Sequence, residues 1–141
     1  MATAKDMGIA DVAFVADVDL TLAQYYFVTV ASTAGNVKVA TGASNPGMIG
    51  VLQNSPSLGQ EARVRMAGLS KVFALTTSSS SITYGRFISV NASGQAVAAG
   101  DLSTCVIAGR WLDAATGVSA SRFGQVFLNL FPATGSLLAT S

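Results

Sequence analysis

An alternation of apolar residues with a period of two constrains this chain more than any other feature of its sequence. Side chains that alternate along a β-strand point to opposite faces, so apolar residues at every second position are typical of a strand that buries one side. No long stretch carries the helical period of about 3.6 residues. The alternation is clearest over residues 11–22, where one face holds Val12, Phe14, Ala16, Val18, Leu20 and Leu22.

The rest of the chain repeats this pattern in short segments separated by glycine, proline and asparagine. Glycine and proline favour the backbone angles of tight turns, so the pattern predicts many short strands joined by turns. The predicted fold class is all-β: a small β-barrel or β-tulip-like domain, or a β-sandwich, with an extended N-terminal arm. Further strands are expected at 25–30, 36–40, 48–53, 61–67, 69–76, 86–90, 95–98, 104–112 and 123–131.

The length of 141 residues fits a single domain. We expect an N-terminal arm at residues 1–16, the β-domain at 17–132 and a C-terminal tail at 133–141. A short helix is expected around 113–121 and an exposed loop at 76–81. The sequence shows no internal repeat.

The composition is poor in charge. Only 11% of the residues are charged, whereas soluble domains average about 25%. A surface with so little charge indicates that copies of the chain, or a partner, cover much of it. Four of the seven acidic residues lie in the first 19 positions, and seven of the eight basic residues lie from Lys38 onward. This asymmetry is consistent with electrostatic docking, or with scattered solvated side chains.

The residue types exclude most catalytic sites. The chain has no histidine and one cysteine, Cys105, which rules out Ser-His-Asp and Cys-His mechanisms and the common zinc sites. Asp17 and Asp19 share one face of the predicted strand, as paired catalytic carboxylates can, but a solvated acidic face is the better interpretation. The sequence therefore predicts a protein that is not an enzyme and uses no cofactor or metal.

Nucleic-acid and membrane partners are also not expected. The net charge is +1, and the aromatic residues are not interleaved with a dense basic patch. No apolar run approaches the roughly 18 residues of a membrane span, and no secretory signal is recognisable. A single cysteine cannot form an internal disulfide, which fits maturation in a reducing cytoplasm.

The central stretch of the sequence carries a family resemblance. It combines the strand residues Met48-Ile49-Gly50-Val51-Leu52-Gln53, a turn with Pro56 and Gly59, and a following segment from Glu61 to Val72. This stretch resembles the head decoration, or capsid cement, proteins of tailed bacteriophages. The segments 94–97, 108–112 and 125–130 are in keeping with the same family, so the resemblance covers roughly residues 17–131.

The resemblance implies a structural virion protein that binds the outer surface of an icosahedral capsid and reinforces the shell against the pressure of packaged DNA. It implies the major capsid protein and a homotrimer as partners, with assembly in the host cytoplasm. The alternative is a β-rich receptor-binding module of a tail or head fibre.

Two sets of contact residues are expected. The arm would add a strand to the capsid through Met7, Ile9, Asp11, Val12, Phe14 and Ala16. The alternative for residues 11–22 is the first strand of the domain's own sheet. Subunit contacts are expected at Trp111, Phe127 and Phe131, because aromatic residues dominate buried interfaces, and ordinary core packing is the alternative for each.

Overall fold

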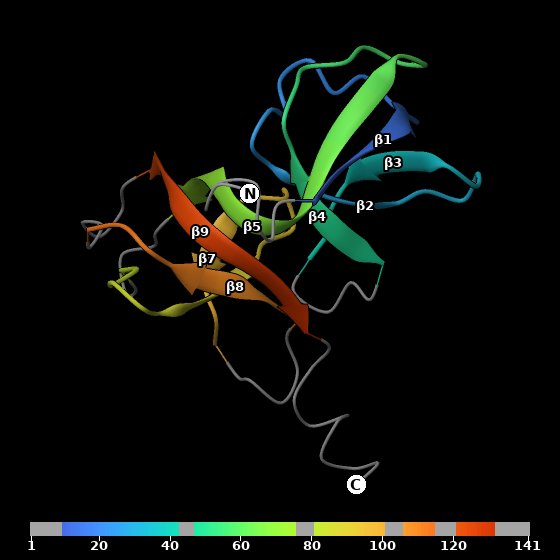
Figure 1. Cartoon of the computed structure of the whole chain (residues 1–141). Coiled ribbons are helices and arrows are strands. Elements are labelled where there is room, and N and C mark those ends of the chain that lie inside the picture. Colours follow the sequence, from blue (N-terminus) through green and yellow to red (C-terminus); the bar gives the residue numbers. More distant parts are fainter. Residues whose placement is uncertain (1–9, 43–46, 76–80, 101–105, 115–120, 132–141) are drawn as a thin grey trace, which may run out of the picture.

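The computed structural model describes residues 10–42, 47–75, 81–100, 106–114 and 121–131. These residues form nine strands and no helix, which confirms the all-β fold class (Figure 1). The strands are β1 (Ala10–Ala16), β2 (Phe27–Val30), β3 (Asn36–Val39), β4 (Met48–Leu52), β5 (Glu61–Leu75), β6 (Phe87–Val90), β7 (Ala96–Ala98), β8 (Ile107–Trp111) and β9 (Ser121–Phe131).

Most strand boundaries differ from the expected ones by one to three residues, and two differences are larger. The two strands predicted at 61–67 and 69–76 form the single long strand β5, and the strand predicted at 11–22 ends at Ala16. β1 pairs on one side with β3 and on the other with β5. Of the two alternatives for this segment, the domain's own sheet therefore holds, and residues 10–16 belong to the sheet rather than to an arm.

The first half of the chain closes into a five-stranded barrel, which we call barrel A. Its strand order is β1-β3-β2-β4-β5, and the pairing of β1 with β5 closes it. Only the β1–β3 pair is parallel. β-branched and other apolar side chains at alternate positions fill the inside. The fully buried ones include Val28, Val37, Leu52 and Val64.

The second half of the chain closes in the same way into barrel B. Its strand order is β5-β7-β6-β8-β9, and the pairing of β5 with β9 closes it. Only the β5–β7 pair is parallel. The buried centre of barrel B includes Val72, Ile88, Trp111 and Val126.

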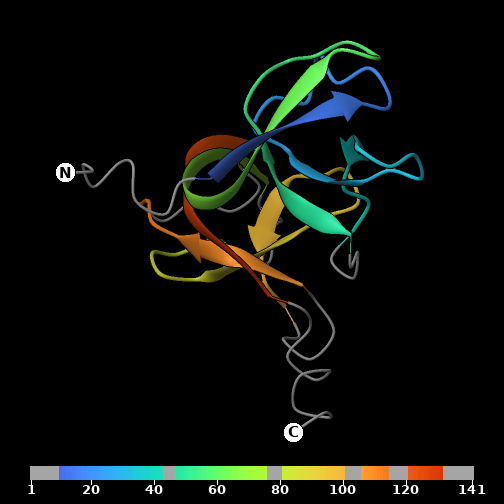
Figure 2. The same ribbon diagram turned by 45° about the vertical axis from the view of Figure 1, so that its right-hand side comes forward.

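The long strand β5 belongs to both barrels. Its first half, up to Ala67, pairs with β1 and β4, and its second half, from Gly68, pairs with β9. Gly68 has a φ of 91°, a conformation that glycine adopts readily and other residues do not. A glycine at this point lets β5 bend out of one barrel and into the other, as Figures 1 and 2 show.

The two barrels have the same topology, which the sequence did not reveal. Each begins with a strand that pairs in parallel with the third strand and antiparallel with the fifth, and in each the second strand lies between the third and the fourth. Thus β1, β2, β3, β4 and the first half of β5 correspond to the second half of β5, β6, β7, β8 and β9. The expectation of no internal repeat is wrong at the level of structure.

Residue register supports this correspondence. Phe27 pairs with Val51 as Phe87 pairs with Arg110. The Ala40 amide donates to the Phe27 carbonyl at 2.9 Å, and Ala99 donates to Phe87 at the same distance. Other equivalent hydrogen bonds run from Tyr25 to Leu52 and from Gly85 to Trp111, both 2.7 Å, and from Gln53 to Arg63 and from Leu112 to Gln125, both 2.8 Å.

Backbone geometry and packing repeat as well. Gly35 and Gly94 occupy equivalent turns with φ of 84° and 79°. Gly50 and Gly109 are equivalent, and a Cβ on either would lie about as close as 2.1 or 2.0 Å to a carbonyl oxygen of the next strand. The repeat is best visible in the sequence at β2 and β6, which read Phe-Val-Thr-Val and Phe-Ile-Ser-Val.

Several expected elements lie outside the described residues. They are the arm residues 1–9, most of the loop at 76–81, most of the helix expected around 113–121, and the tail at 133–141. Within that last helix range, Ser121 begins β9.

Candidate functional site

The structure places the residues predicted for the arm in different environments. Met7 and Ile9 lie outside the described residues. Ala16 is buried and Phe14 packs against the core of barrel A. Val12 faces the inside of the same barrel, opposite Val64, yet 41% of it is exposed. Val12, Phe14 and Ala16 are therefore part of barrel A, and Val12 marks an end of the barrel that is open to solvent.

Asp11 forms an ion pair with Arg65 on the outside of barrel A. The Arg65 guanidinium donates from Nε to Asp11 Oδ1 at 2.7 Å and from Nη2 to Asp11 Oδ2 at 3.0 Å. Both side chains are about three-quarters buried, and Arg65 also donates to the Leu69 carbonyl at 2.9 Å. The hydrogen bond from Arg65 lowers the pKa of Asp11, and burial opposes this only in part. A carboxylate held in this way serves the fold and is not free to bind a partner.

The residues predicted for subunit contacts also separate. Trp111 is fully buried in barrel B, with its indole nitrogen donating to the Ala114 carbonyl at 3.0 Å. Core packing, the alternative interpretation, therefore holds for Trp111. Phe127 is 46% exposed and remains a contact candidate. The side chain of Phe131 lies outside the described residues.

Phe127 belongs to an exposed row of side chains that crosses four strands of barrel B. Leu69 on β5 pairs with Phe127 on β9, Phe127 pairs with Arg110 on β8, and Arg110 pairs with Phe87 on β6. Because directly paired residues of antiparallel strands point to the same face, all four side chains lie on one surface. We call this set the barrel B row. The sequence analysis predicted only Phe127 among its members.

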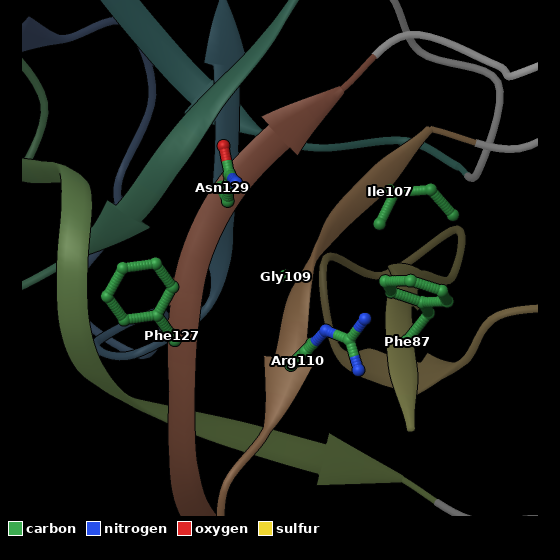
Figure 3. A pocket seen from close by; sticks show the side chains of 6 residues that line it. All are labelled: Phe87, Ile107, Gly109, Arg110, Phe127 and Asn129. Atoms are coloured by element: carbon green, nitrogen blue, oxygen red, sulfur yellow. The ribbon is translucent and has the colours of Figure 1, made fainter. Parts of the chain in front are cut away.

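A shallow hollow of about 180 Å³ lies on this surface. Figure 3 shows the Arg110 side chain extending toward Phe87 and Ile107 on one side of Gly109, while Phe127 and Asn129 lie on the other side. The Arg110 guanidinium lies 4.4 Å from the centre of the Phe87 ring, a cation–π contact. An arginine stacked on an aromatic ring beside apolar side chains is typical of protein-binding surfaces.

A second group of aromatic residues lies where the two barrels meet. Phe73 packs edge-on against Phe123 and stacks on Tyr26, with ring centres 5.1 and 5.5 Å apart. The Lys71 ammonium lies 5.0 Å from the Tyr25 ring and 4.7 Å from the Phe123 ring. This group stiffens the junction, and an open groove of about 270 Å³ runs beside it.

The described surface carries many large hydrophobic side chains that are exposed to solvent. Large hydrophobic side chains that are at least 40% exposed occur on both barrels, so the low charge of the sequence does correspond to uncovered apolar surface. They are Val12, Val15, Val18, Leu22, Val30, Leu58, Leu69, Tyr84, Phe123 and Phe127.

The described residues offer no cluster of side chains that could hold a metal ion. Asp17 accepts a hydrogen bond from Asn36 Nδ2 at 2.9 Å, and Asp19 accepts one from the Thr21 amide at 3.1 Å. No three acidic or cysteine side chains gather in the part of the chain that the structure describes. That part also contains no helix long and apolar enough to span a membrane.

Comparison with known proteins supports the fold. No protein-family model matches the sequence, and no curated protein matches it, so the resemblance to head decoration proteins stays a prediction. Among solved structures, the fold is similar to that of the head fiber gp8.5 N base of bacteriophage phi29, with a TM-score of 0.59. The likeness covers 86% of this chain and 94% of that chain at 14% identity. It therefore extends over both barrels.

Proposed function

We propose that the chain is a structural protein of a tailed-bacteriophage virion that binds the outer capsid surface and reinforces the shell. The observation that carries this proposal is the likeness, over 86% of the chain, to the base of a phage head fiber. The sequence resemblance to head decoration proteins is the reason for proposing the finer role on the capsid surface. The major capsid protein is the proposed partner, the virion surface the proposed location, and the host cytoplasm the proposed site of assembly.

The exposed surface supports a binding role. A decoration protein holds a lattice together without chemistry, so its free energy must come from covering apolar and backbone groups of its neighbours. The barrel B row offers Leu69 and Phe127 at 45% and 46% exposure, beside Arg110. We propose that the chain acts as a homotrimer, because a trimer that engages several shell subunits turns weak single contacts into durable attachment.

The structure changes how the N-terminus could contribute. Strand addition by residues 10–16 is not available, because β1 already pairs with β3 and with β5, and residues 17–22 form no strand. Only residues 1–9 remain as a candidate capsid-binding arm. Deleting residues 1–16 would remove β1 and open barrel A, so it cannot serve as a clean test of binding.

The test of the proposal compares the full chain with a variant that lacks residues 1–9. Electron microscopy of capsids with and without added protein measures attachment, and the temperature at which the capsids break measures reinforcement. We expect the full chain to coat expanded capsids and raise this temperature, and the shortened chain to bind more weakly while keeping its fold. Absence of the full chain from capsids prepared in its presence contradicts the proposal.

A receptor-binding module of a head or tail fibre is the second candidate, because the similar solved structure is itself part of a head fiber. The number of copies per particle separates the two candidates. A decoration protein is present in hundreds of copies and a fibre in few, which quantitative mass spectrometry of purified virions measures directly.

A further inference from the structure

The contact between the two barrels inside the chain shows how a second copy could pack against the first. Barrel A covers barrel B with its outward-facing residues Phe27, Ala40, Met48 and Val51, which are buried in the same apolar cluster as the centre of barrel B. Phe27 and Val51 point away from the inside of their own barrel, yet neither is exposed at all. Their burial comes from barrel B.

The equivalent surface of barrel B is covered only in part. The residues equivalent to Phe27, Ala40, Met48 and Val51 are Phe87, Ala99, Ile107 and Arg110. Phe87 is only partly buried, Arg110 is exposed, and the hollow of about 180 Å³ lies between these side chains. Ala99 and Ile107 are buried, at 4% and 3% exposure. Barrel B therefore presents to solvent the Phe87 and Arg110 part of the surface that barrel A buries entirely.

The complementary surface is exposed on barrel A. Inside the chain, the covered end of barrel B includes Ser70 and Val90, which are 2% and 1% exposed. Their equivalents on barrel A are Val12 and Val30, which are 41% and 49% exposed although both belong to the inward-facing set of their strands. We call Val12 and Val30 the open end of barrel A.

Two side-chain hydrogen bonds join the barrels inside the chain, and the equivalent residues could make the corresponding contacts between copies. Gln53 of barrel A donates to the Ser70 hydroxyl at 2.9 Å, and the equivalent residues are Leu112, which is 36% exposed, and Val12. A polar pair inside the chain thus corresponds to an apolar pair between copies. Both replacements are apolar, so the pair remains compatible with burial.

The second contact adds charge complementarity. Gln95 of barrel B donates to the Tyr26 hydroxyl of barrel A at 3.4 Å. The equivalent residues are Asn36, which is hydrogen-bonded to Asp17, and Arg86. Between copies, an arginine would therefore approach the Asp17 carboxylate. This matches the acidic start and basic remainder of the sequence.

We propose that copies of the chain associate head to tail, with the open end of barrel A of one copy seated on the Phe87, Arg110 and Leu112 surface of barrel B of the next. In this contact, barrel B of one copy packs against barrel A of another in the way that barrel A packs against barrel B within one chain. A repeated contact between different surfaces closes into a ring when its rotation allows and otherwise extends as a filament. The inference rests on the self-association in the proposed function and names its surfaces, whereas capsid attachment is measured separately.

The test uses two variants, each of which damages one surface. Val30→Glu places a charge at the open end of barrel A, and Leu112→Glu places one on the surface of barrel B. Both positions are partly exposed, so the fold should tolerate the change, and circular dichroism checks this. Leu58→Glu is the matched control, because Leu58 is 67% exposed and lies on neither surface.

Native mass spectrometry and sedimentation then give the masses. We expect oligomers of the wild type and of Leu58→Glu, and monomers of Val30→Glu and of Leu112→Glu. An equimolar mixture of the last two should form a dimer with one chain of each, because Leu112→Glu keeps its open end and Val30→Glu keeps its barrel B surface. A monomeric wild type, single variants that keep the wild-type mass, or a mixture that stays monomeric overturns the proposal. Failure of capsid binding leaves these masses unchanged, so the two proposals fail separately.

Discussion

Asp11 and Arg65 form their ion pair at the positions that Leu69 and Phe127 occupy in barrel B. In both barrels the two residues are direct partners in the ladder that closes the barrel. The charged pair of barrel A is hydrogen-bonded at 2.7 and 3.0 Å, whereas the apolar pair of barrel B is nearly half exposed. One topology therefore carries a charged, hydrogen-bonded pair at this place on barrel A and an exposed apolar pair at the same place on barrel B.

The ion pair predicts a specific dependence of stability on pH. The pKa of Asp11 is lower in the folded chain than its ordinary value of 3.8, so its contribution is complete above that value. The contribution is lost as the pH falls through the lower, folded pKa. Asp11→Asn should reduce the free energy of unfolding by about 1 kcal/mol at pH 7, and by less at pH 3. Urea unfolding at the two pH values measures both differences.

The exposed pair of Glu61 and Arg63 provides the control for this prediction. Its atoms are 3.4 Å apart and both side chains are about 60% exposed. Glu61→Gln should change the unfolding midpoint little at either pH. An equal loss for Asp11→Asn at pH 7 and pH 3 would show that the ion pair does not produce the effect.

The two equivalent glycines Gly50 and Gly109 should both resist substitution. A Cβ would lie 2.1 Å from the Arg65 carbonyl oxygen at Gly50, and 2.0 Å from that of Phe127 at Gly109. Each alanine variant must push two paired strands apart, which should cost about 3 kcal/mol or more. Gly100→Ala is the control, because nothing lies within 4 Å of its Cβ position. Urea midpoints near the wild type for either of the first two variants contradict this close approach.

At one pair of equivalent positions, the centres of the two barrels hold different residues. Barrel A has Leu52 with Ala62, and barrel B has Trp111 with Gly124, where a Cβ on Gly124 would lie 2.0 Å from the Trp111 ring. Gly124→Ala should cost about 2–3 kcal/mol, and Trp111→Leu a similar amount through the cavity that it leaves. The double variant recreates the pair of barrel A and should cost at least about 1 kcal/mol less than the sum.

Additivity is the outcome that contradicts this prediction. A double-mutant cycle from urea unfolding measures the coupling between Trp111 and Gly124. Leu58→Ala combined with Gly124→Ala is the control, since Leu58 is an exposed loop residue and should show no coupling.

A strained position in barrel A has a relaxed equivalent in barrel B. Tyr25 has a φ of 69°, which is unusual for a residue other than glycine, and its equivalent Gly85 has a φ of 82°. Nothing lies within 4 Å of a Cβ on Gly85, so Gly85→Ala should cost only the backbone strain, about 1 kcal/mol. Gly85→Asn should cost less, because asparagine tolerates this conformation better. Thermal unfolding compares the two, and equal losses would argue against backbone strain.

The alternation in the sequence determined the all-β class and the place of nearly every strand. This succeeded because a strand with one buried face must alternate, and the turns between strands need glycine or proline. Residues 61–67 follow the same rule. Glu61, Arg63 and Arg65 point to the outside of barrel A, while Ala62 and Val64 are buried inside it. The alternation also placed Phe127 on the face opposite Val126 and Leu128, and the structure showed that 46% of it is exposed.

Only the tertiary structure decided how the strands close and which apolar residues stay uncovered. The alternation of β1 is the same for a free arm and for a paired strand, because pairing depends on backbone groups that carry no side-chain signal. The repeat is hidden in the sequence because equivalent places in the two barrels hold different residues, such as Leu52 with Ala62 and Trp111 with Gly124. Phe27 and Phe87 hold equivalent positions, and the covering barrel buries Phe27 completely whereas Phe87 stays partly exposed.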